Sequence, residues 1–272
     1  VEGNTKEARE HAVSFGMLTQ SDNYVKTLRA IRPDLEIDVI FPTDGEVPGQ
    51  EVAALMEYDG IIFTGSSLHA YDTDPKVTCQ VDLMKQCFEA GAQVVGSCWG
   101  MQVAVVAAGG TVEPNKKGRE IGVARRITVT ARGNGHALFS DKTSIFDAVA
   151  IHLDHVSKLP VEAEVLASNE MSEVQAIEMK IGSSEFWGVQ YHPEFDLGYI
   201  AGVFQRYAEM MLDEKFARSP EDLEKLVEDF RTLDEHGNDA LAWRYNVQPD
   251  VLDFGVRTRE IANWLAKVAV VR

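Results

Sequence analysis

The chain has 272 residues, of which 45% are hydrophobic and 25% are charged, as is ordinary for a globular protein whose core needs no disulfide or metal. Its net charge of −17 comes from 26 basic and 43 acidic side chains and disfavours nucleic acid and anionic membranes as partners. Neither a membrane-spanning apolar run nor a signal peptide is apparent, and three irregularly spaced cysteines favour a reducing, cytoplasmic environment.

The first forty residues predict one helix and one strand. Residues 5–20 are polar and only weakly periodic, so we expect a loop over a sheet edge. Ser21 is a suitable N-cap for a helix that runs to about Ile31 and ends at Pro33. The alternating residues 36–41 predict a strand.

A second strand and a second long helix follow. After a turn at 45–49 and a short helix at 51–56, the apolar residues 60–63 predict a buried parallel strand. This strand ends in the polar turn 64–67. A proline in first position and apolar residues at helical spacing predict a helix over 75–90.

The next strand and helix enclose a motif with chemical meaning. Residues 93–95 predict a buried strand that breaks at Gly96, and a segment with helical periodicity begins near Met101. Between them lies G-x-C-x-G, the cysteine form of the nucleophile elbow, which exposes Cys98 at a strained strand-to-helix turn. The helix N-terminus favours the thiolate form of such a cysteine. A buried structural cysteine is the alternative interpretation.

The middle of the chain is rich in strands. Residues 111–130 predict short strands with Arg125 and Arg126 in solvent, and residues 137–147 predict a helix or loop. Further apolar stretches with strand character lie at 148–153, 165–167, 174–179 and 186–190.

The last of these strands leads to a base for the cysteine. A nucleophilic cysteine needs a base, and the base needs a third group that fixes its tautomer. His192 follows the strand at the sheet edge where we expect Cys98, Glu194 can reach the far side of the imidazole, and Pro193 stiffens the link. A surface histidine beside an unrelated glutamate is the alternative.

Together these motifs resemble the class I (triad) glutamine amidotransferase family. The likeness rests on G-S-C-W-G-M-Q at 96–102 and on G-V-Q-Y-H-P-E at 188–194. Residues 108–112 and 119–122 are similar to segments of the glutaminase domain of GMP synthase, and the resemblance extends to about Met211.

The resemblance implies an α/β fold with a doubly wound, mostly parallel sheet of the flavodoxin-like sort. Residues 1–212 would form the amidotransferase domain and residues 213–272 a helical C-terminal extension. The family opens with a strand that ends in a polar turn, so residues 1–5 are expected to follow a strand that begins before this sequence. No cofactor and no metal site are expected, since the histidines are scattered.

The resemblance also implies residue roles. Cys98 would attack the glutamine side-chain carbonyl, His192 would transfer protons, and Glu194 would orient the imidazole. The family's oxyanion turn is Gly-Gly-Pro, of which Gly65 matches the first glycine while Ser66 and Ser67 replace the rest. The oxyanion donors are therefore expected around Gly65, Ser66 and Trp99. Substrate contacts are implied for Gln102, Asp154, His155 and Val156.

The C-terminal extension is predicted to consist of helices with apolar packing faces. Ser219 is a strong N-cap for a helix to about residue 236, and a last helix is predicted over 256–269. We expect the extension to pack on the domain or to form a homo-oligomer interface, on surface that other family members use to dock a synthetase.

The predicted function is that of a stand-alone class I glutamine amidotransferase. It would release glutamate and ammonia through a γ-glutamyl thioester, for an unidentified acceptor or synthetase partner. The alternative is a γ-glutamyl hydrolase that releases a larger amine or a peptide by the same chemistry. A non-catalytic interaction module is the remaining alternative, and the complete triad argues against it.

Overall fold

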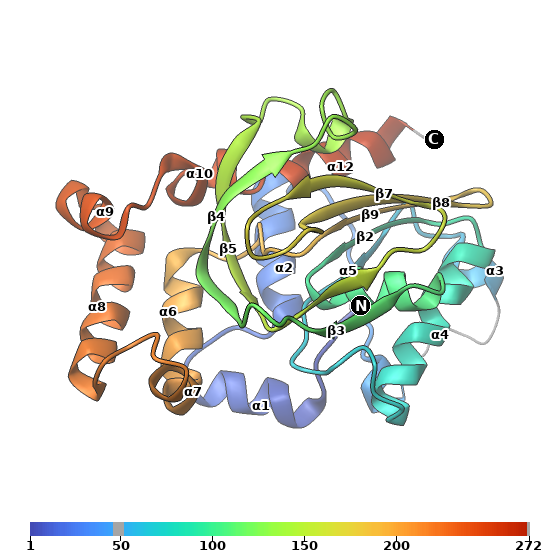
Figure 1. The fold of residues 1–272 in the computed structure, drawn as a ribbon. Coiled ribbons are helices and arrows are strands. Elements are labelled where there is room, and N and C mark those ends of the chain that lie inside the picture. Colours follow the sequence, from blue (N-terminus) through green and yellow to red (C-terminus); the bar gives the residue numbers. More distant parts are fainter. Residues whose placement is uncertain (46–51, 271–272) are drawn as a thin grey trace.

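The computed structural model describes residues 1–45 and 52–270 and shows a curled sheet with helices on both faces (Figure 1). The central sheet has the strand order β1-β2-β9-β8-β7-β4-β5. Its strands are β1 (Ile61–Phe63), β2 (Gln93–Ser97), β4 (Glu120–Val129), β5 (Ile145–His152), β7 (Ala163–Ser168), β8 (Ala176–Ile181) and β9 (Ser184–Val189). A separate antiparallel pair consists of β3 (Thr111–Pro114) and β6 (Asp154–Lys158).

The direction of the strands confirms the predicted fold class. β1, β2 and β9 are parallel neighbours, whereas the pairs from β9 to β5 are antiparallel. Five of the seven strands nevertheless run the same way, because only β8 and β4 run against the rest. The parallel part places the carboxyl ends of β2 and β9 at one edge, where ligands bind in open α/β sheets.

Alternating side chains of β2 and β9 bury both faces of the sheet. Val94 and Phe186 pack in one apolar cluster, under α4 (Pro75–Glu89) and α5 (Trp99–Ala107). Val95 and Trp187 pack in another, under α2 (Gln20–Ile31) and α12 (Arg259–Val270). Because successive strand residues point to opposite faces, these near-continuous apolar strands require helices on both sides.

A third apolar cluster lies outside β4 and β5, at the left of Figure 1. It joins these strands to α6 (Leu197–Arg206), α7 (Ala208–Asp213) and α8 (Pro220–His236). The predicted cap of α8 is confirmed, since the Ser219 hydroxyl accepts a hydrogen bond from the Asp222 N–H. The remaining helices are α1 (Lys6–Ser14), α3 (Val52–Leu55), α9 (Asp239–Tyr245), α10 (Pro249–Leu252), α11 (Phe254–Arg257) and the 3-10 turns Pro42–Asp44 and Ala137–Phe139.

The amino-terminal third contains several corrections. Residues 5–20 are not a loop, because Thr5 caps α1. The cap of α2 is Thr19 rather than Ser21. Residues 36–41 form no strand, although the Ile40 carbonyl accepts a hydrogen bond from the Glu2 N–H. The predicted turn at 45–49 and the start of the helix at 51–56 lie largely outside the described residues.

Arg125 is a further correction, because it is not simply solvated. Its guanidinium binds the Asp147 carboxylate at 2.9 Å and also donates to the carbonyls of Tyr245 and Asn246. The arginine thereby links the sheet to the loop after α9. None of the helices in the described ranges is long and apolar enough to cross a membrane.

Candidate active site

The turn after β2 has the geometry of a nucleophile elbow. Cys98 has φ 49° and ψ −103°, a left-handed conformation that non-glycine residues rarely adopt, and it occupies the N-cap position of α5. A Cβ on Gly96 would lie 2.6 Å from the Gly100 carbonyl carbon, and one on Gly100 would lie 2.4 Å from the Phe63 carbonyl oxygen. Both glycines are therefore required for the close approach of strand and helix.

Cys98, His192 and Glu194 come together at the carboxyl ends of β2 and β9. The Cys98 N–H donates to the Val189 carbonyl at 2.7 Å, which ties the elbow to β9. The His192 Nδ1 donates to Glu194 Oε1 at 2.7 Å, and both side chains are at most 2% exposed. The Cys98 sulfur lies close enough to the same imidazole to raise its pKa, and the thiol donates to the Ile151 carbonyl at 3.6 Å. The order thiol, imidazole, carboxylate is that of a catalytic triad.

The charges of this group favour a protonated histidine. Burial alone would lower the pKa of His192, but the Glu194 carboxylate and the Cys98 sulfur outweigh it and raise that pKa to about 10. An imidazolium between a carboxylate and a thiol stabilises the thiolate and carries a proton for a leaving group.

Glu194 is held by residues that the sequence motifs do not indicate. The Ser97 hydroxyl donates to Glu194 Oε1 at 3.1 Å and accepts from the Tyr24 hydroxyl at 2.7 Å. Asn23 donates to the Glu194 carbonyl at 2.9 Å. Ser97 belongs to the elbow motif, whereas Tyr24 lies on one face of a predicted helix among apolar residues such as Leu28 and Ile31. Polar residues interrupting such a face were the available signal.

The imidazole ring is also fixed by stacking. Phe195 lies parallel to His192 with 4.0 Å between ring centroids, and Tyr199 stacks on the other side of Phe195. The main-chain N–H of His192 donates a hydrogen bond to the Val149 carbonyl of β5 at 2.8 Å. Stacking and backbone contacts together restrict the ring to one plane.

The turn at 64–67 borders this group, as expected. A Cβ on Gly65 would lie 2.7 Å from His192 Cε1, so only glycine fits beside the imidazole. The Asn4 side chain accepts hydrogen bonds from the Ser67 N–H and the Ser66 hydroxyl, at 3.0 and 3.3 Å. Within the described ranges no hydrogen bond occupies the N–H groups of Ser66 and Trp99, which leaves them available to an oxyanion.

Gln102 of α5 contacts Asp154 at the start of β6. The Gln102 amide donates to the Asp154 carbonyl at 3.1 Å and to Gln190 Oε1 at 3.2 Å. The Asp154 carboxylate accepts from His69 Nδ1 at 2.6 Å and from the Tyr71 hydroxyl at 3.4 Å. His69 and Tyr71 were not predicted, because they lie in a turn without a recognisable motif.

The other two predicted substrate contacts lie on β6, away from the triad. His155 pairs with Glu113 of β3 and is half-buried, and the Val156 side chain belongs to the apolar core under α5. The buried histidine of this region is His152, which donates to the Asp154 carbonyl and to the Glu120 carboxylate, both at 3.0 Å.

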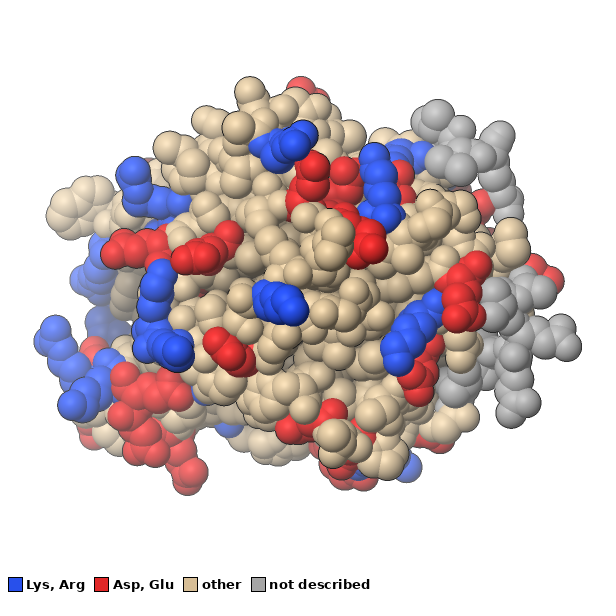
Figure 2. All heavy atoms as spheres, turned by 45° about the vertical axis from the view of Figure 1, so that its right-hand side comes forward, with Lys and Arg blue, Asp and Glu red and all other residues tan. Residues whose placement is uncertain are grey.

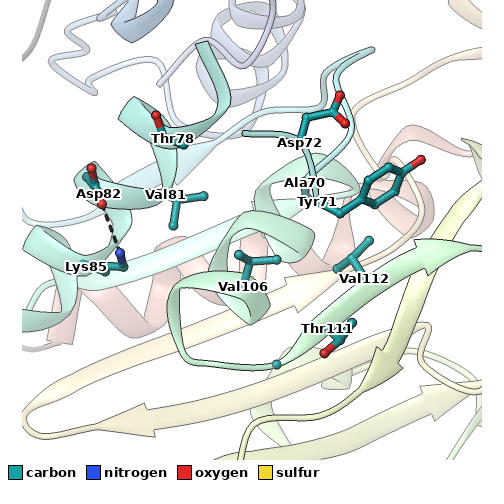
Figure 3. A pocket seen from close by; sticks show the side chains of 11 residues that line it. Ala70, Tyr71, Asp72, Thr78, Val81, Asp82, Lys85, Val106, Thr111 and Val112 are labelled. Carbon is teal, nitrogen blue, oxygen red and sulfur yellow. Dashed lines mark hydrogen bonds and ion pairs between the residues drawn. The ribbon is translucent and has the colours of Figure 1, made fainter. Parts of the chain in front are cut away.

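A separate hollow of about 290 Å³ lies between α4, the end of α5 and the start of β3 (Figure 3). Its floor is formed by Val81, Val106 and Val112, and the Asp82–Lys85 ion pair lies at its rim. Tyr71 borders this hollow while its hydroxyl points away toward Asp154. The described residues contain no cluster of three His, Cys, Asp or Glu side chains suited to a metal ion.

Comparison with known proteins finds one matching family model, similar relatives and solved structures with the same fold. The model of the family "Glutamine amidotransferase class-I" matches residues 20–203. A γ-glutamyl-L-1-hydroxyisopropylamide hydrolase of Pseudomonas sp. is 32% identical over 99% of this chain and 92% of its own length. A glutamine-hydrolysing GMP synthase of Neisseria meningitidis is 30% identical over 55% of this chain and 26% of its own length. A glutamine amidotransferase structure from Thermotoga maritima shares the fold, with a TM-score of 0.67 at 17% identity and 90% of each chain covered.

Proposed function

The chain belongs to the class-I glutamine amidotransferase family, and on that premise we propose that it hydrolyses γ-glutamyl amides of small amines. The observation that carries the proposal is the buried Glu194–His192 pair directed at Cys98, which lies at the tip of a strained elbow. This combination supplies a nucleophile, a proton carrier and an orienting carboxylate in one place.

The first half of the reaction forms an acyl-enzyme. The Cys98 thiolate attacks the γ-carbonyl carbon, and the N–H groups of Ser66 and Trp99, beside Gly65, stabilise the resulting oxyanion. The carbon–nitrogen bond then breaks as the His192 Nε2 donates its proton to the departing amine. A γ-glutamyl thioester on Cys98 remains.

Water completes the reaction. Neutral His192 takes a proton from the attacking water, and the thioester collapses to glutamate and free Cys98. Glu194 stabilises the imidazolium that forms in this step and, through Nδ1, keeps the ring in the productive tautomer.

The glutamyl part of the substrate is assigned to the other wall of the site. Asp154 offers a buried carboxylate for an α-ammonium group, and the Gln102 amide holds the Asp154 main chain in place. The main chain at His155 and Val156 contributes to the same wall, since the Val156 side chain lies in the apolar core.

The extent of similarity supports an amine other than ammonia as the leaving group. The Pseudomonas hydrolase is similar over nearly the whole chain, including the helices after residue 212, whereas the GMP synthase is similar over about half of it. Glutamine hydrolysis for a synthetase partner is the second candidate, favoured by the GMP synthase likeness. Self-association through the C-terminal extension stays a prediction.

The test compares two leaving groups at one site. The purified chain is assayed with γ-glutamyl amides of small primary amines and with glutamine, and amine, ammonia and glutamate are quantified. We expect kcat/KM for a substituted amide to exceed that for glutamine by about tenfold or more. The reverse ratio would favour the glutaminase candidate, and no hydrolysis of either substrate would contradict both.

A further inference from the structure

One face of α2 is directed at the triad. Residues 20, 23, 24 and 27 are spaced i, i+3, i+4 and i+7, so their side chains share a face of the helix. Asn23 and Thr27 donate to the Glu194 carbonyl, at 2.9 and 3.5 Å. Tyr24 reaches the Glu194 carboxylate through Ser97. Three of the four residues on this face thus have polar contacts that support the triad.

Gln20, the fourth residue, has no such contact. Its Oε1 atom is shielded from solvent and has no hydrogen-bond partner among the described residues. A Cβ on Gly65 would lie 3.4 Å from this oxygen and 2.7 Å from His192 Cε1. The amide and the imidazole therefore border the same space beside Gly65. Because a shielded polar group without a partner is costly, its partner is expected to arrive with a ligand.

The orientation of the imidazole indicates which part of the ligand would supply the hydrogen-bond partner of Gln20. Nδ1 faces Glu194, so Nε2 is the nitrogen that serves Cys98 and the departing amine. Cε1 lies next to Nε2 on the ring and faces Gly65 and Gln20. A leaving nitrogen bound at Nε2 would carry its substituent into the space beside Gly65, toward Gln20.

We propose that Gln20 is a specificity residue that recognises the leaving amine by accepting a hydrogen bond from a hydroxyl or similar donor on its substituent. The inference rests on the proposed function, since it concerns the amine that leaves this same site. It assigns the amine to the α2 wall and leaves the glutamyl group to Asp154 and Gln102. Ammonia has no substituent and makes no use of Gln20.

The experiment uses Gln20→Leu, which removes the polar atoms at similar size. The matched control is Gln86→Leu on α4, a half-buried glutamine without a side-chain hydrogen bond in the described chain. Each protein is assayed with two γ-glutamyl amides of equal size, one with a hydroxyl on the amine substituent and one without. Alkylation of Cys98 by iodoacetamide and the pH–rate profile are measured alongside.

For Gln20→Leu we expect kcat/KM to fall about tenfold with the hydroxylated amide and less than threefold with the other. The pH profile and the alkylation rate should stay unchanged, and Gln86→Leu should match wild type. Equal losses with both amides, or a shifted pH profile, would show that Gln20 acts through His192 and overturn the proposal. A wild type inactive on both amides would instead overturn the proposed function.

Discussion

At the scale of residues, Cys98, His192 and Glu194 have unequal supports and unequal roles. His192 is stacked on Phe195, is hydrogen-bonded to Glu194 and has a raised pKa, whereas in the proposed mechanism Glu194 acts only through the imidazole. One oxygen of Glu194 is held by His192 and Ser97, while Oε2 has no partner among the described residues. The carboxylate is thus placed to orient and to balance charge rather than to react.

This difference predicts an order of losses. His192→Ala removes the proton carrier of both half-reactions and should lower kcat/KM by about a thousandfold or more, whereas Glu194→Gln should cost less. Steady-state rates of amine release measure both, with circular dichroism as a control for folding. A greater loss in Glu194→Gln than in His192→Ala would contradict these roles.

At the scale of elements, α12 belongs to the same core as the sheet. Trp264 packs against Gly60 at the start of β1, and its neighbours join the cluster under β2 and β9. Glu260 accepts hydrogen bonds from the Lys142 ammonium and from the Tyr191 hydroxyl, both at 2.6 Å, and all three side chains are buried. Tyr191 directly precedes His192, so the end of the extension supports the turn after β9 that carries His192.

Removing one member of this buried pair should be costly. Glu260→Ala leaves the Lys142 charge without its partner and should lower the free energy of unfolding by about 3 kcal/mol. The exposed Glu228→Ala on α8 is the control, with a change below about 0.5 kcal/mol. Urea denaturation measures both. If Glu260→Ala unfolds at the same urea concentration as wild type, α12 does not depend on this pair.

The contacts between helices and strands can be predicted from the sequence only in part. The elbow and the His192–Glu194 pair were predictable because their geometry is imposed by neighbouring residues, such as the close approach at Gly96 and Gly100. The Lys142–Glu260 pair joins residues far apart in the chain, and nothing local indicates it. Trp243 of α9 is 86% exposed, although a tryptophan in a sequence usually indicates a largely buried position.

The wrong predictions near the amino terminus also arise because contacts between distant residues are not visible in the local sequence. Residues 36–41 alternate like a strand, but alternation describes only a half-buried extended segment and does not supply the paired neighbour. Residues 6–14 lack a continuous apolar stripe, yet Thr5 caps them as α1 and Ala12 is buried against the third cluster. At residues 36–41 and at residues 6–14, tertiary contacts decide which secondary structure forms.

At the scale of the whole molecule, the chain carries a net charge of −17. On the face shown in Figure 2, basic side chains lie interspersed with acidic ones. Inside the molecule, the Glu194 carboxylate and the Cys98 sulfur outweigh the effect of burial and raise the pKa of His192 to about 10. Global stability should therefore respond to the titration of this one group.

The sign of the response follows from linkage. The pKa of His192 is about 10 in the folded chain and about 6.5 in a model peptide. The stabilisation is therefore fully present below about pH 6.5 and is lost as the pH rises through 10. We expect the stability difference between wild type and His192→Gln, measured by urea denaturation, to decrease across this window. A difference that does not vary with pH would contradict a raised pKa.

The central claim is that Cys98 is the nucleophile of a γ-glutamyl amide hydrolase. It is tested most directly by the rate of amine release from a γ-glutamyl amide by Cys98→Ala, measured beside wild type and beside Cys79→Ala, the half-buried cysteine of α4. We predict a loss of about a thousandfold or more for Cys98→Ala with an unchanged fold, and wild-type activity for Cys79→Ala. Residual activity of folded Cys98→Ala within tenfold of wild type would contradict the claim.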